Sequence, residues 1–410
     1  MRIANVMRRL AFDEWGGTET AVWNSSLKLK EAGNFVEILA TKALCGCERE
    51  ERDGLPVRRF NYFYPHLFLS KQNKLVLDKK GGSPCSFPLY SYLKKTPFDL
   101  IHSHAMGRVA KLALKAARQK RIPFIISFHG GNYDVPQAEM DEMLKPLKGS
   151  LGYGRFIERL LALPGDIVKE SDGIICVGKN EFDLVREKFP GKPSIYLPNG
   201  VDYRKFERAV TESFRKTYSI PPERKLLLCV SRIDYQKNQC AIIRLAKELA
   251  AGGENVHCAI IGFITSSSYY EKLCREIEEA GMKDRVTIVP GLPPGSDLLL
   301  SAYRESDLFI LPSVHEPFGI VVLEAWSAKL PAIVSQVGGL KTLVEPGRNG
   351  FHFDPQDVVS MKTAYHAVMS SRARIIQNAY QEVLDRYSWD TVTASLVRFY
   401  ESVRMNFSGH

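Results

Sequence analysis

Short apolar runs rich in β-branched residues alternate with helical patterns along most of the chain, and this alternation limits the fold more than any other feature. In the first half, strands are predicted at 2–6, 35–40, 99–102, 123–127, 173–177 and 193–197, with helices at 17–32, 107–119, 154–168 and 179–189. Strand–helix alternation of this kind is typical of a parallel sheet covered by helices on both faces.

The same pattern restarts after the turn-rich segment 198–202. Strands are predicted at 225–230, 256–261, 285–289, 307–311, 331–334 and 350–353, and helices at 237–251, 268–280, 318–328, 356–369, 371–385 and 389–405. The sequence therefore predicts an α/β chain with two doubly wound, Rossmann-like domains, over 1–200 and 201–385, and a terminal helix over 386–410. Ligands of such sheets bind at the carboxyl ends of the strands, so we expect a site in a cleft between the domains.

The composition is that of a globular protein, with 45% hydrophobic and 25% charged residues. No apolar run approaches the roughly 20 residues that span a bilayer, and the N-terminal apolar stretch is too short for a signal peptide. The eight cysteines are scattered and several lie inside apolar runs, so we expect reduced thiols that pack as small core residues. These features predict a cytoplasmic location.

The net charge of +10 is distributed unevenly, because the first 200 residues carry nine of the ten excess positive charges. The first domain is therefore expected to face something acidic, such as an anionic membrane surface, a phosphorylated small molecule or nucleic acid. Simple solubility is an equally good explanation of the charge. No nucleic-acid-binding motif accompanies it, so we expect no nucleic-acid partner.

The most informative segment is 311–325, which runs from a predicted strand through a loop into a helix. Glu316 lies in the loop, Pro317 suits the first turn of a helix, and Gly319 permits close approach of a ligand. Backbone N–H groups of Phe318, Gly319 and Ile320 would point at that ligand. Glu324, two helical turns on, is expected on the same face as Glu316. Taken singly, either glutamate suits an ordinary helical or N-terminal charge.

Taken whole, the segment E-P-F-G-x-x-x-x-E closely resembles the motif of retaining nucleotide-sugar glycosyltransferases of the GT-B fold, the large fourth sequence family. Further segments resemble that family in the expected order. They are Gly16-Gly17, His104, the loop of His129 and Asn132, Arg232 with Lys237, Gly262, Gly291-Leu292, and 387–390 before the last helix.

The resemblance implies two facing Rossmann-like domains, acceptor-binding and donor-binding, with the C-terminal helix crossing back to the first. Arg232 and Lys237 would hold the donor diphosphate, Glu316 the sugar hydroxyls and Glu324 the ribose, and His129 would approach the transferred sugar. Donor contacts are also implied for Gly16, Gly17, Gly262, Gly291, Leu292, Phe318, Gly319 and Ile320, and acceptor contacts for His104 and Asn132. The family generally needs no metal, and the absence of G-x-G-x-x-G leaves a nicotinamide or flavin cofactor unsupported.

The implied reaction moves a hexose from a uridine or guanosine diphosphate sugar to a hydroxyl of a saccharide, lipid-linked glycan or small molecule, with retention. Two alternatives stay open: a sugar-nucleotide epimerase of the same fold, and a non-catalytic sugar-nucleotide-binding subunit. A basic helix over 108–121 could contact an anionic membrane or acceptor, or simply be solvated. Its cations are Arg108, Lys111, Lys115, Arg118, Lys120 and Arg121.

Overall fold

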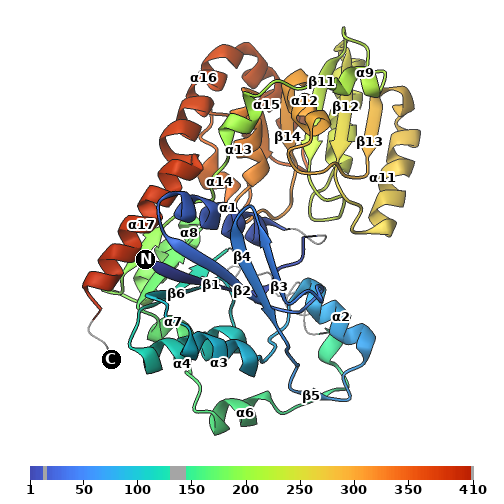
Figure 1. Cartoon of the computed structure of the whole chain (residues 1–410). Coiled ribbons are helices and arrows are strands. Elements are labelled where there is room, and N and C mark those ends of the chain that lie inside the picture. The colour runs from blue at the N-terminus through green and yellow to red at the C-terminus, as the bar shows by residue number, and fades with distance from the viewer. Residues whose placement is uncertain (13–15, 130–144, 408–410) are drawn as a thin grey trace. The chain divides into compact units, whose positions relative to one another are not determined.

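A computed structural model describes residues 1–12, 16–129 and 145–407. The chain divides into two compact units, one formed by 1–198 with 392–410 and the other by 199–391. Each unit is described by itself. The fold class predicted from the sequence is confirmed, because each unit is a largely parallel sheet flanked by helices (Figure 1).

The first unit contains an eight-stranded sheet with the order β10-β9-β7-β6-β1-β2-β4-β3. Neighbouring strands are parallel except for the β3–β4 hairpin at the edge. The strands are β1 (Arg2–Arg9), β2 (Phe35–Thr41), β3 (Arg49–Arg52), β4 (Leu55–Phe60), β6 (Leu100–Ser103), β7 (Phe124–Phe128), β9 (Gly173–Cys176) and β10 (Ser194–Tyr196). All six strands predicted for this half are confirmed, whereas β3 and β4 were not predicted.

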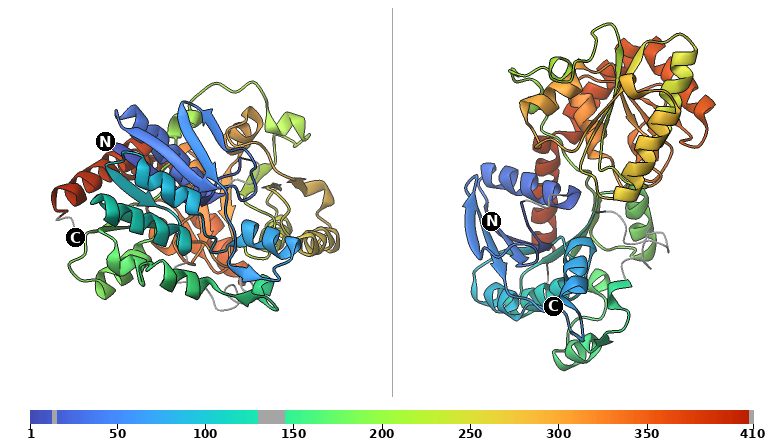
Figure 2. Two further views of the ribbon diagram at one scale, coloured as in Figure 1. Left: turned by 60° about the horizontal axis from the view of Figure 1, so that its bottom comes forward. Right: turned by 90° about the vertical axis from the view of Figure 1, so that its right-hand side faces the viewer.

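The helices of this unit are α1 (Gly17–Glu31), α2 (Lys71–Lys80), α3 (Phe87–Lys95), α4 (Arg108–Lys120), α6 (Gly154–Leu160), α7 (Ile167–Glu170), α8 (Lys179–Lys188) and α17 (Trp389–Met405), of which the last belongs here from Val392 onward. Side chains alternate between the faces of a strand. Ile101 therefore packs with α4 in the core, whereas His102 points to the other face, where Tyr400 of α17 meets it. Figures 1 and 2 show α17, in red, along that sheet.

The predicted helix over 154–168 is wrong, since α6 ends at Leu160 and α7 begins at Ile167. Between them Ala162 adopts a left-handed φ of 44°, and Pro164 lacks the N–H that a continuous helix needs. Just before α6, the short strand β8 (Leu151–Gly152) pairs antiparallel with β5 (His66–Leu67).

The cations of α4 do not form a free basic face. Arg108 and Lys111 both pair with Glu158 of α6, at 2.8 and 2.7 Å, and Arg118 pairs with Asp172 at 3.1 Å. Lys115 donates to the carbonyl of Leu161, and Lys120 to those of Leu93 and Thr96. These five side chains hold neighbouring segments of the same unit, so a contact of helix 108–121 with a membrane or an acceptor stays a prediction.

The second unit contains a six-stranded, wholly parallel sheet with the order β13-β12-β11-β14-β15-β16. The strands are β11 (Lys225–Val230), β12 (Val256–Ile261), β13 (Val286–Val289), β14 (Leu308–Leu311), β15 (Ala332–Ser335) and β16 (Phe351–Phe353). All six match the predicted strands. Near-continuous apolar strands such as β12 and β14 are buried on both faces, as parallel strands between helices must be.

The helices of the second unit are α9 (Phe214–Thr217), α10 (Cys240–Ala251), α11 (Ser267–Glu279), α12 (Asp297–Glu305), α13 (Ile320–Ser327), α14 (Leu340–Leu343), α15 (Val358–Ser370) and α16 (Arg372–Glu382). Helix α12 was not predicted. The eight cysteines are all free thiols, and five of them are buried.

Candidate functional site

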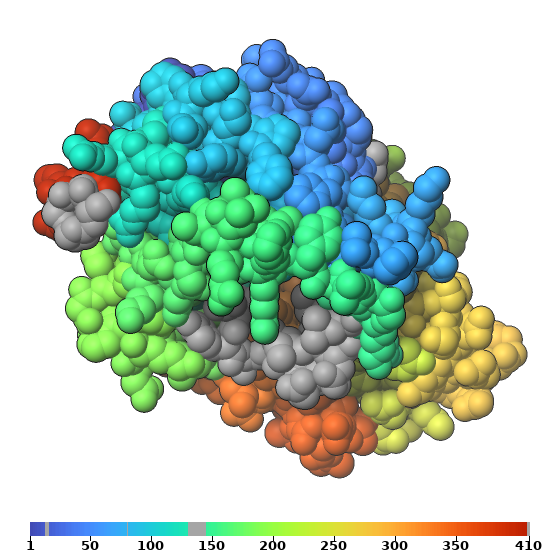
Figure 3. Space-filling model, turned by 90° about the horizontal axis from the view of Figure 1, so that it is seen from below, coloured from blue at the N-terminus to red at the C-terminus, as the bar shows by residue number. Residues whose placement is uncertain are grey.

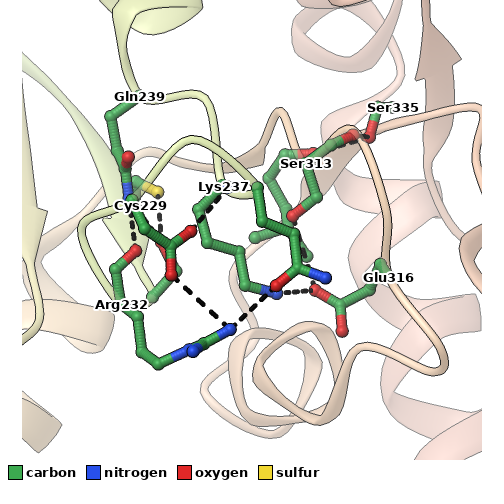
Figure 4. Close-up of polar contacts among 11 residues, drawn as sticks. Cys229, Arg232, Lys237, Gln239, Ser313, Glu316 and Ser335 are labelled. Atoms are coloured by element: carbon green, nitrogen blue, oxygen red, sulfur yellow. Dashed lines mark hydrogen bonds and ion pairs between the residues drawn. The ribbon is translucent and has the colours of Figure 1, made fainter. Parts of the chain in front are cut away.

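In the second unit, the loops after two neighbouring strands bring Lys237 and Glu316 together. Lys237 follows β11, and Glu316 follows β14, which pairs with β11. The ammonium group lies 2.6 Å from Oε2 of Glu316, and each side chain is only 12% exposed (Figure 4). The carboxyl ends of parallel strands thus place a partly buried cation and a carboxylate side by side.

Backbone contacts fix this ion pair. The N–H of Val314 donates to the carbonyl of Gln236, which ties the two loops together at 2.8 Å. The N–H of Gly339 donates to the carbonyl of Glu316 at 2.8 Å. A Cβ atom on Gly338 would lie 2.2 Å from the same carbonyl oxygen, so the loop after β15 can approach Glu316 only because glycine lies there.

Arg232 lies on the same side as the ion pair. Its guanidinium donates to Oε1 of Gln236 at 2.8 Å and lies 3.5 Å from a carboxylate oxygen of Asp234 (Figure 4). The buried Gln239 fixes the loop, because its amide donates to Ser231 Oγ and to the carbonyl of Arg232. Arg232 is 54% exposed, so the guanidinium remains accessible.

Two details of the 311–325 segment differ from the prediction. Helix α13 begins at Ile320, and Gly319 with a φ of 96° precedes it, so Pro317 lies before the helix and not in its first turn. Glu316 is therefore outside the helix and does not share a helical face with Glu324. The predicted contact of Phe318 can involve only its backbone, because its side chain is 5% exposed and packs edge-on to Tyr387.

Glu324 accepts a hydrogen bond from Tyr303 of α12 at 2.7 Å. Burial raises the pKa of this carboxyl above its usual value, while the hydrogen bond from Tyr303 acts in the opposite direction. Tyr303 is itself buried. The sequence analysis missed Tyr303, because it missed the whole of α12, and an aromatic inside an apolar helix gives no sign of a polar partner.

The remaining donor-binding candidates of this unit follow strand ends. A Cβ atom on Gly262, after β12, would lie 1.7 Å from the carbonyl oxygen of Ser231, so Gly262 is needed for close packing of two strand ends. Gly291 and Leu292 follow β13, and Gly291 has a left-handed φ of 95° beside the ring of Phe263. Ile320 is the half-buried first residue of α13.

In the first unit, polar side chains gather on the face of the sheet that α17 covers. His102 of β6 contacts Tyr400 Oη through Nδ1 and Ser127 Oγ through Nε2, both at 2.6 Å. His104 contacts His129 Nε2 through Nδ1 at 2.9 Å and the carboxamide oxygen of Asn5 through Nε2 at 3.3 Å. The rings of His102 and His104 lie 3.9 Å apart between centroids. Two of the predicted site residues, His104 and His129, are thus direct partners.

All three histidines are neutral at pH 7. Burial lowers the pKa of His102 to about 3 and that of His129 to about 4, and it lowers that of His104 well below its usual value. Neighbouring rings reinforce the shifts of His102 and His104, since two imidazolium charges at this distance would repel each other.

The hydrogen bonds also fix where the protons lie. Asn5 donates through Nδ2 to Ser26 Oγ at 2.8 Å, so its carboxamide oxygen accepts from His104 Nε2. Neutral His104 must then accept at Nδ1 from Nε2 of His129. His129 consequently carries its lone pair on Nδ1 and can accept a hydrogen bond there. Asn5, which the sequence analysis missed, sets this tautomer from β1.

Gly16 and Gly17 lie at the start of α1. Gly16 caps the helix in an extended conformation, and Gly17 is its first residue. Glu19 in the first turn lies 3.4 Å from the guanidinium Nε of Arg9, a residue that was not predicted. Asn132, the second acceptor candidate, lies outside the described residues.

The part of the chain that the structure describes contains no group of three or more His, Cys, Asp or Glu side chains able to hold a metal ion. Among the same residues, we find no helix that is both long and apolar enough to cross a bilayer.

Comparison with known proteins agrees with this geometry. The model of the family "Glycosyltransferase Family 4" matches residues 15–205, and that of "Glycosyl transferases group 1" matches residues 210–382. The chain belongs to the GT-B glycosyltransferases of the family 4 type. It is a glycosyltransferase.

The individual proteins that resemble this chain share a third or less of its residues in the matched regions. An uncharacterized glycosyltransferase of Methanocaldococcus jannaschii is 33% identical over 241 residues, which are 57% of this chain and 60% of that protein. This match therefore spans less than two thirds of that relative. D-inositol 3-phosphate glycosyltransferase 2 of Catenulispora acidiphila is 28% identical, covering 94% of this chain and 90% of its own. The crystal structure of Anabaena HepE in complex with UDP and glucose is 16% identical, with a TM-score of 0.70 and coverage of 98% and 100%.

Proposed function

We propose that this chain transfers a hexose from a uridine or guanosine diphosphate sugar to an acceptor hydroxyl, with retention of the anomeric configuration and without a metal ion. The acceptor would be a saccharide, a lipid-linked glycan or a small molecule. The observation that carries the proposal is the 2.6 Å Lys237–Glu316 pair beside Arg232. It offers cations for a departing diphosphate and a carboxylate for sugar hydroxyls.

Charge develops in two places when a glycosidic bond to a diphosphate breaks: the sugar becomes positive and the phosphate negative. Lys237 and Arg232 would stabilise the phosphate, which is why no metal is required in this proposal. Glu316 holds the Lys237 ammonium in place before the donor binds. With the donor bound, Lys237 would donate to a phosphate oxygen while Glu316 accepts from the sugar.

Other residues would orient the donor. Glu324, held by Tyr303, would accept from the ribose hydroxyls. His129 would accept a hydrogen bond from a sugar hydroxyl at Nδ1, and His104 would act through His129 rather than through the acceptor. The amides at Gly16 and Gly17 lie at a helix N-terminus, which favours a phosphate oxygen. The attack would occur on the face that the diphosphate leaves, with the leaving phosphate taking the acceptor's proton.

The comparisons support the choice of donor and suggest an acceptor to assay. Anabaena HepE is described in complex with UDP and glucose, so UDP-glucose is the first donor to try. Relatives that resemble this chain over most of its length are D-inositol 3-phosphate glycosyltransferases, so a phosphorylated polyol is a direct acceptor candidate. The excess positive charge of the first half is compatible with such an acceptor.

The test compares Lys237→Ala with Lys225→Ala. Both lysines belong to ion pairs of the second unit, but Lys225 pairs with Glu254 at the opposite end of β11. Loss of Lys237 should lower kcat/KM for transfer by roughly a hundredfold or more, as for other transition-state charge contacts. Lys225→Ala should keep wild-type turnover, and thermal unfolding should show that both variants fold.

Three results would contradict the proposal. Equal turnover by Lys237→Ala and wild type would remove the diphosphate role. Conversion of the donor to another nucleotide sugar without acceptor would indicate an epimerase, and donor binding with no turnover would indicate a non-catalytic subunit. NMR of the first product formed tests retention, and an excess of chelator, which should leave turnover unchanged, tests metal independence.

A further inference from the structure

Helix α6 is attached to the first unit by its charged side and exposes its apolar side. Glu158 turns inward to Arg108 and Lys111 of α4. Phe156 and Leu160 are four residues apart and share one helix face, about 200° away from Glu158. They are 67% and 70% exposed. An ordinary surface helix has the reverse arrangement, with apolar residues inward.

The apolar side of α6 continues onto the strand pair β5–β8. Leu67 and Leu151 are direct cross-strand partners, 47% and 62% exposed. The N–H of Tyr153, just before α6, donates to the carbonyl of Pro65 at 3.0 Å, so the two segments are fastened together. We call Leu67, Phe68, Leu151, Phe156 and Leu160 the exposed apolar face.

Phe68 is the most exposed member and adopts an unfavourable backbone conformation. Its φ of 63° is in the left-handed region, which bulky residues rarely adopt, and its side chain is 86% exposed. Because the ring of Phe68 is exposed to solvent, packing within the protein does not offset the cost of this backbone conformation. Backbone strain of this kind points to a role in contact with something outside the chain.

The two described segments that carry the exposed apolar face are basic. Segments 65–80 and 145–163 contain eight lysines and arginines and only two carboxylates. Both carboxylates are engaged, since Asp78 accepts from Tyr62 and Tyr64 at 2.6 and 3.0 Å and Glu158 pairs with α4. Figure 3 shows part of these segments, in blue and green, close together on one face of the first unit. Among these cations are the exposed Lys71, Lys148, Arg155 and Arg159.

We propose that the exposed apolar face docks onto an anionic lipid bilayer, with its side chains entering the interfacial region and the exposed cations of the same segments contacting lipid headgroups. Apolar side chains with exposed cations on the same two segments match both layers of such a surface. A second copy of this chain fits less well, because a symmetric contact would bring the same cations face to face. The proposal places the membrane contact on α6 and the β5–β8 pair, apart from the basic helix 108–121.

The experiment measures flotation of the full chain with vesicles of phosphatidylcholine and phosphatidylglycerol in equal amounts, and with phosphatidylcholine alone. Neither contains a glycolipid, so binding reports the bilayer and not an acceptor. The double variant Phe156→Ser with Leu160→Ser should lose roughly tenfold or more of its affinity for the anionic vesicles, because two apolar side chains no longer leave water. Val359→Ser is the matched control, since Val359 is 68% exposed on α15 of the second unit.

Two further variants separate the contributions. Phe68→Gly should also weaken binding while the thermal midpoint stays unchanged, because glycine accepts the left-handed φ. Lys148→Glu with Arg155→Glu should weaken binding about fivefold or more for each cation removed, and neutral vesicles should bind poorly.

Four outcomes would overturn the proposal. The first is that the wild type does not bind anionic vesicles. The second is that Val359→Ser loses as much affinity for them as the serine double variant. The third is that the serine double variant binds like the wild type, which would show charge attraction alone. The fourth is a concentration-dependent dimer in sedimentation that Phe156→Ser with Leu160→Ser abolishes, which would identify a second copy as the occupant. Vesicle binding needs no turnover, so the result is independent of the proposed reaction.

Discussion

The Lys237–Glu316 site and the His104–His129 cluster both lie at the carboxyl ends of parallel strands, yet they stabilise polar groups in opposite ways. The first joins two opposite charges. The second holds three histidines neutral, and in it His129 donates to His104, which donates to the carboxamide oxygen of Asn5. Burial causes both arrangements. A buried charge is stable only beside an opposite charge, and a buried titratable group without such a partner is neutral.

The difference corresponds to what each group would handle in the proposed reaction. A departing diphosphate carries charge and needs cations, whereas a sugar hydroxyl needs an acceptor with a fixed direction. A neutral ring whose tautomer is set by a carboxamide supplies such a direction without attracting a competing ion. The comparison therefore predicts different sensitivities of the two units to acid and to loss of a positioning residue.

Acid should produce the largest effect, and mainly through the first unit. An unfolded histidine takes up a proton near pH 6.5, but folded His102 and His129 do so only near 3 and 4. Between pH 6.5 and 4 the unfolded state therefore binds more protons, and stability falls by about 1.4 kcal/mol per pH unit for each such histidine. Above pH 6.5 this loss is absent. Urea unfolding at pH 7, 6 and 5 measures it.

The matched variants are His102→Gln in the cluster and His257→Gln in the second unit, where burial lowers the pKa of His257 to about 4. Each should reduce the slope of stability against pH by about one proton. In the wild type, the histidine cluster should therefore contribute more than His257 to the pH dependence of the unfolding free energy. A slope that His102→Gln leaves unchanged would show that the cluster is already protonated, and the neutral arrangement would be wrong.

Asn5 offers a second test, with an effect of intermediate size. Asn5→Leu removes the acceptor of His104 Nε2, so the tautomer of His129 is no longer fixed. We expect kcat to fall roughly tenfold, equivalent to about 1.4 kcal/mol. The unfolding free energy should fall by about 1–3 kcal/mol, because the Nε2–H group of His104 is then buried without a partner. Steady-state kinetics and urea unfolding measure the two.

Ser26→Ala is the control, because it removes only the partner of Asn5 Nδ2 and leaves the bond from His104 intact. It should reduce stability while kcat is kept. If both variants lowered kcat equally, general loosening of the sheet would explain the effect, and the positioning role of Asn5 would fail.

The sequence predicted the strands of the two parallel sheets well. Every predicted strand exists, because runs such as 124–126 and 226–229 are apolar enough for burial on both faces. The sequence also placed Lys237 and Glu316 in loops that follow strands, but that the two strands are neighbours and the two side chains meet is seen only in the structure.

What the sequence could not give depends on contacts between distant segments. Asn5 and Tyr400 are ordinary residues of a strand and a helix until the fold places them beside His104 and His102. The exposure of Phe156 was likewise hidden, because the apolar pattern of α6 reads as a core face. Only the pairing of Glu158 with α4 shows that the helix is attached by its other side.

The smallest expected effect returns to the second unit, where Tyr303 tests whether Glu324 behaves like Glu316. Tyr303→Phe removes a hydrogen bond to the partly buried carboxylate of Glu324, and because that bond lowers the pKa of Glu324, its loss should raise this pKa further. We expect the donor KM to rise a few-fold, matching about 0.5–1.5 kcal/mol for one hydrogen bond, and more so at acidic pH. Tyr365→Phe is the control, since this buried tyrosine donates to Glu254 away from the site. An unchanged donor KM in Tyr303→Phe at every pH would separate Glu324 from ribose binding and leave the Lys237–Glu316 pair as the charged contact that the donor needs.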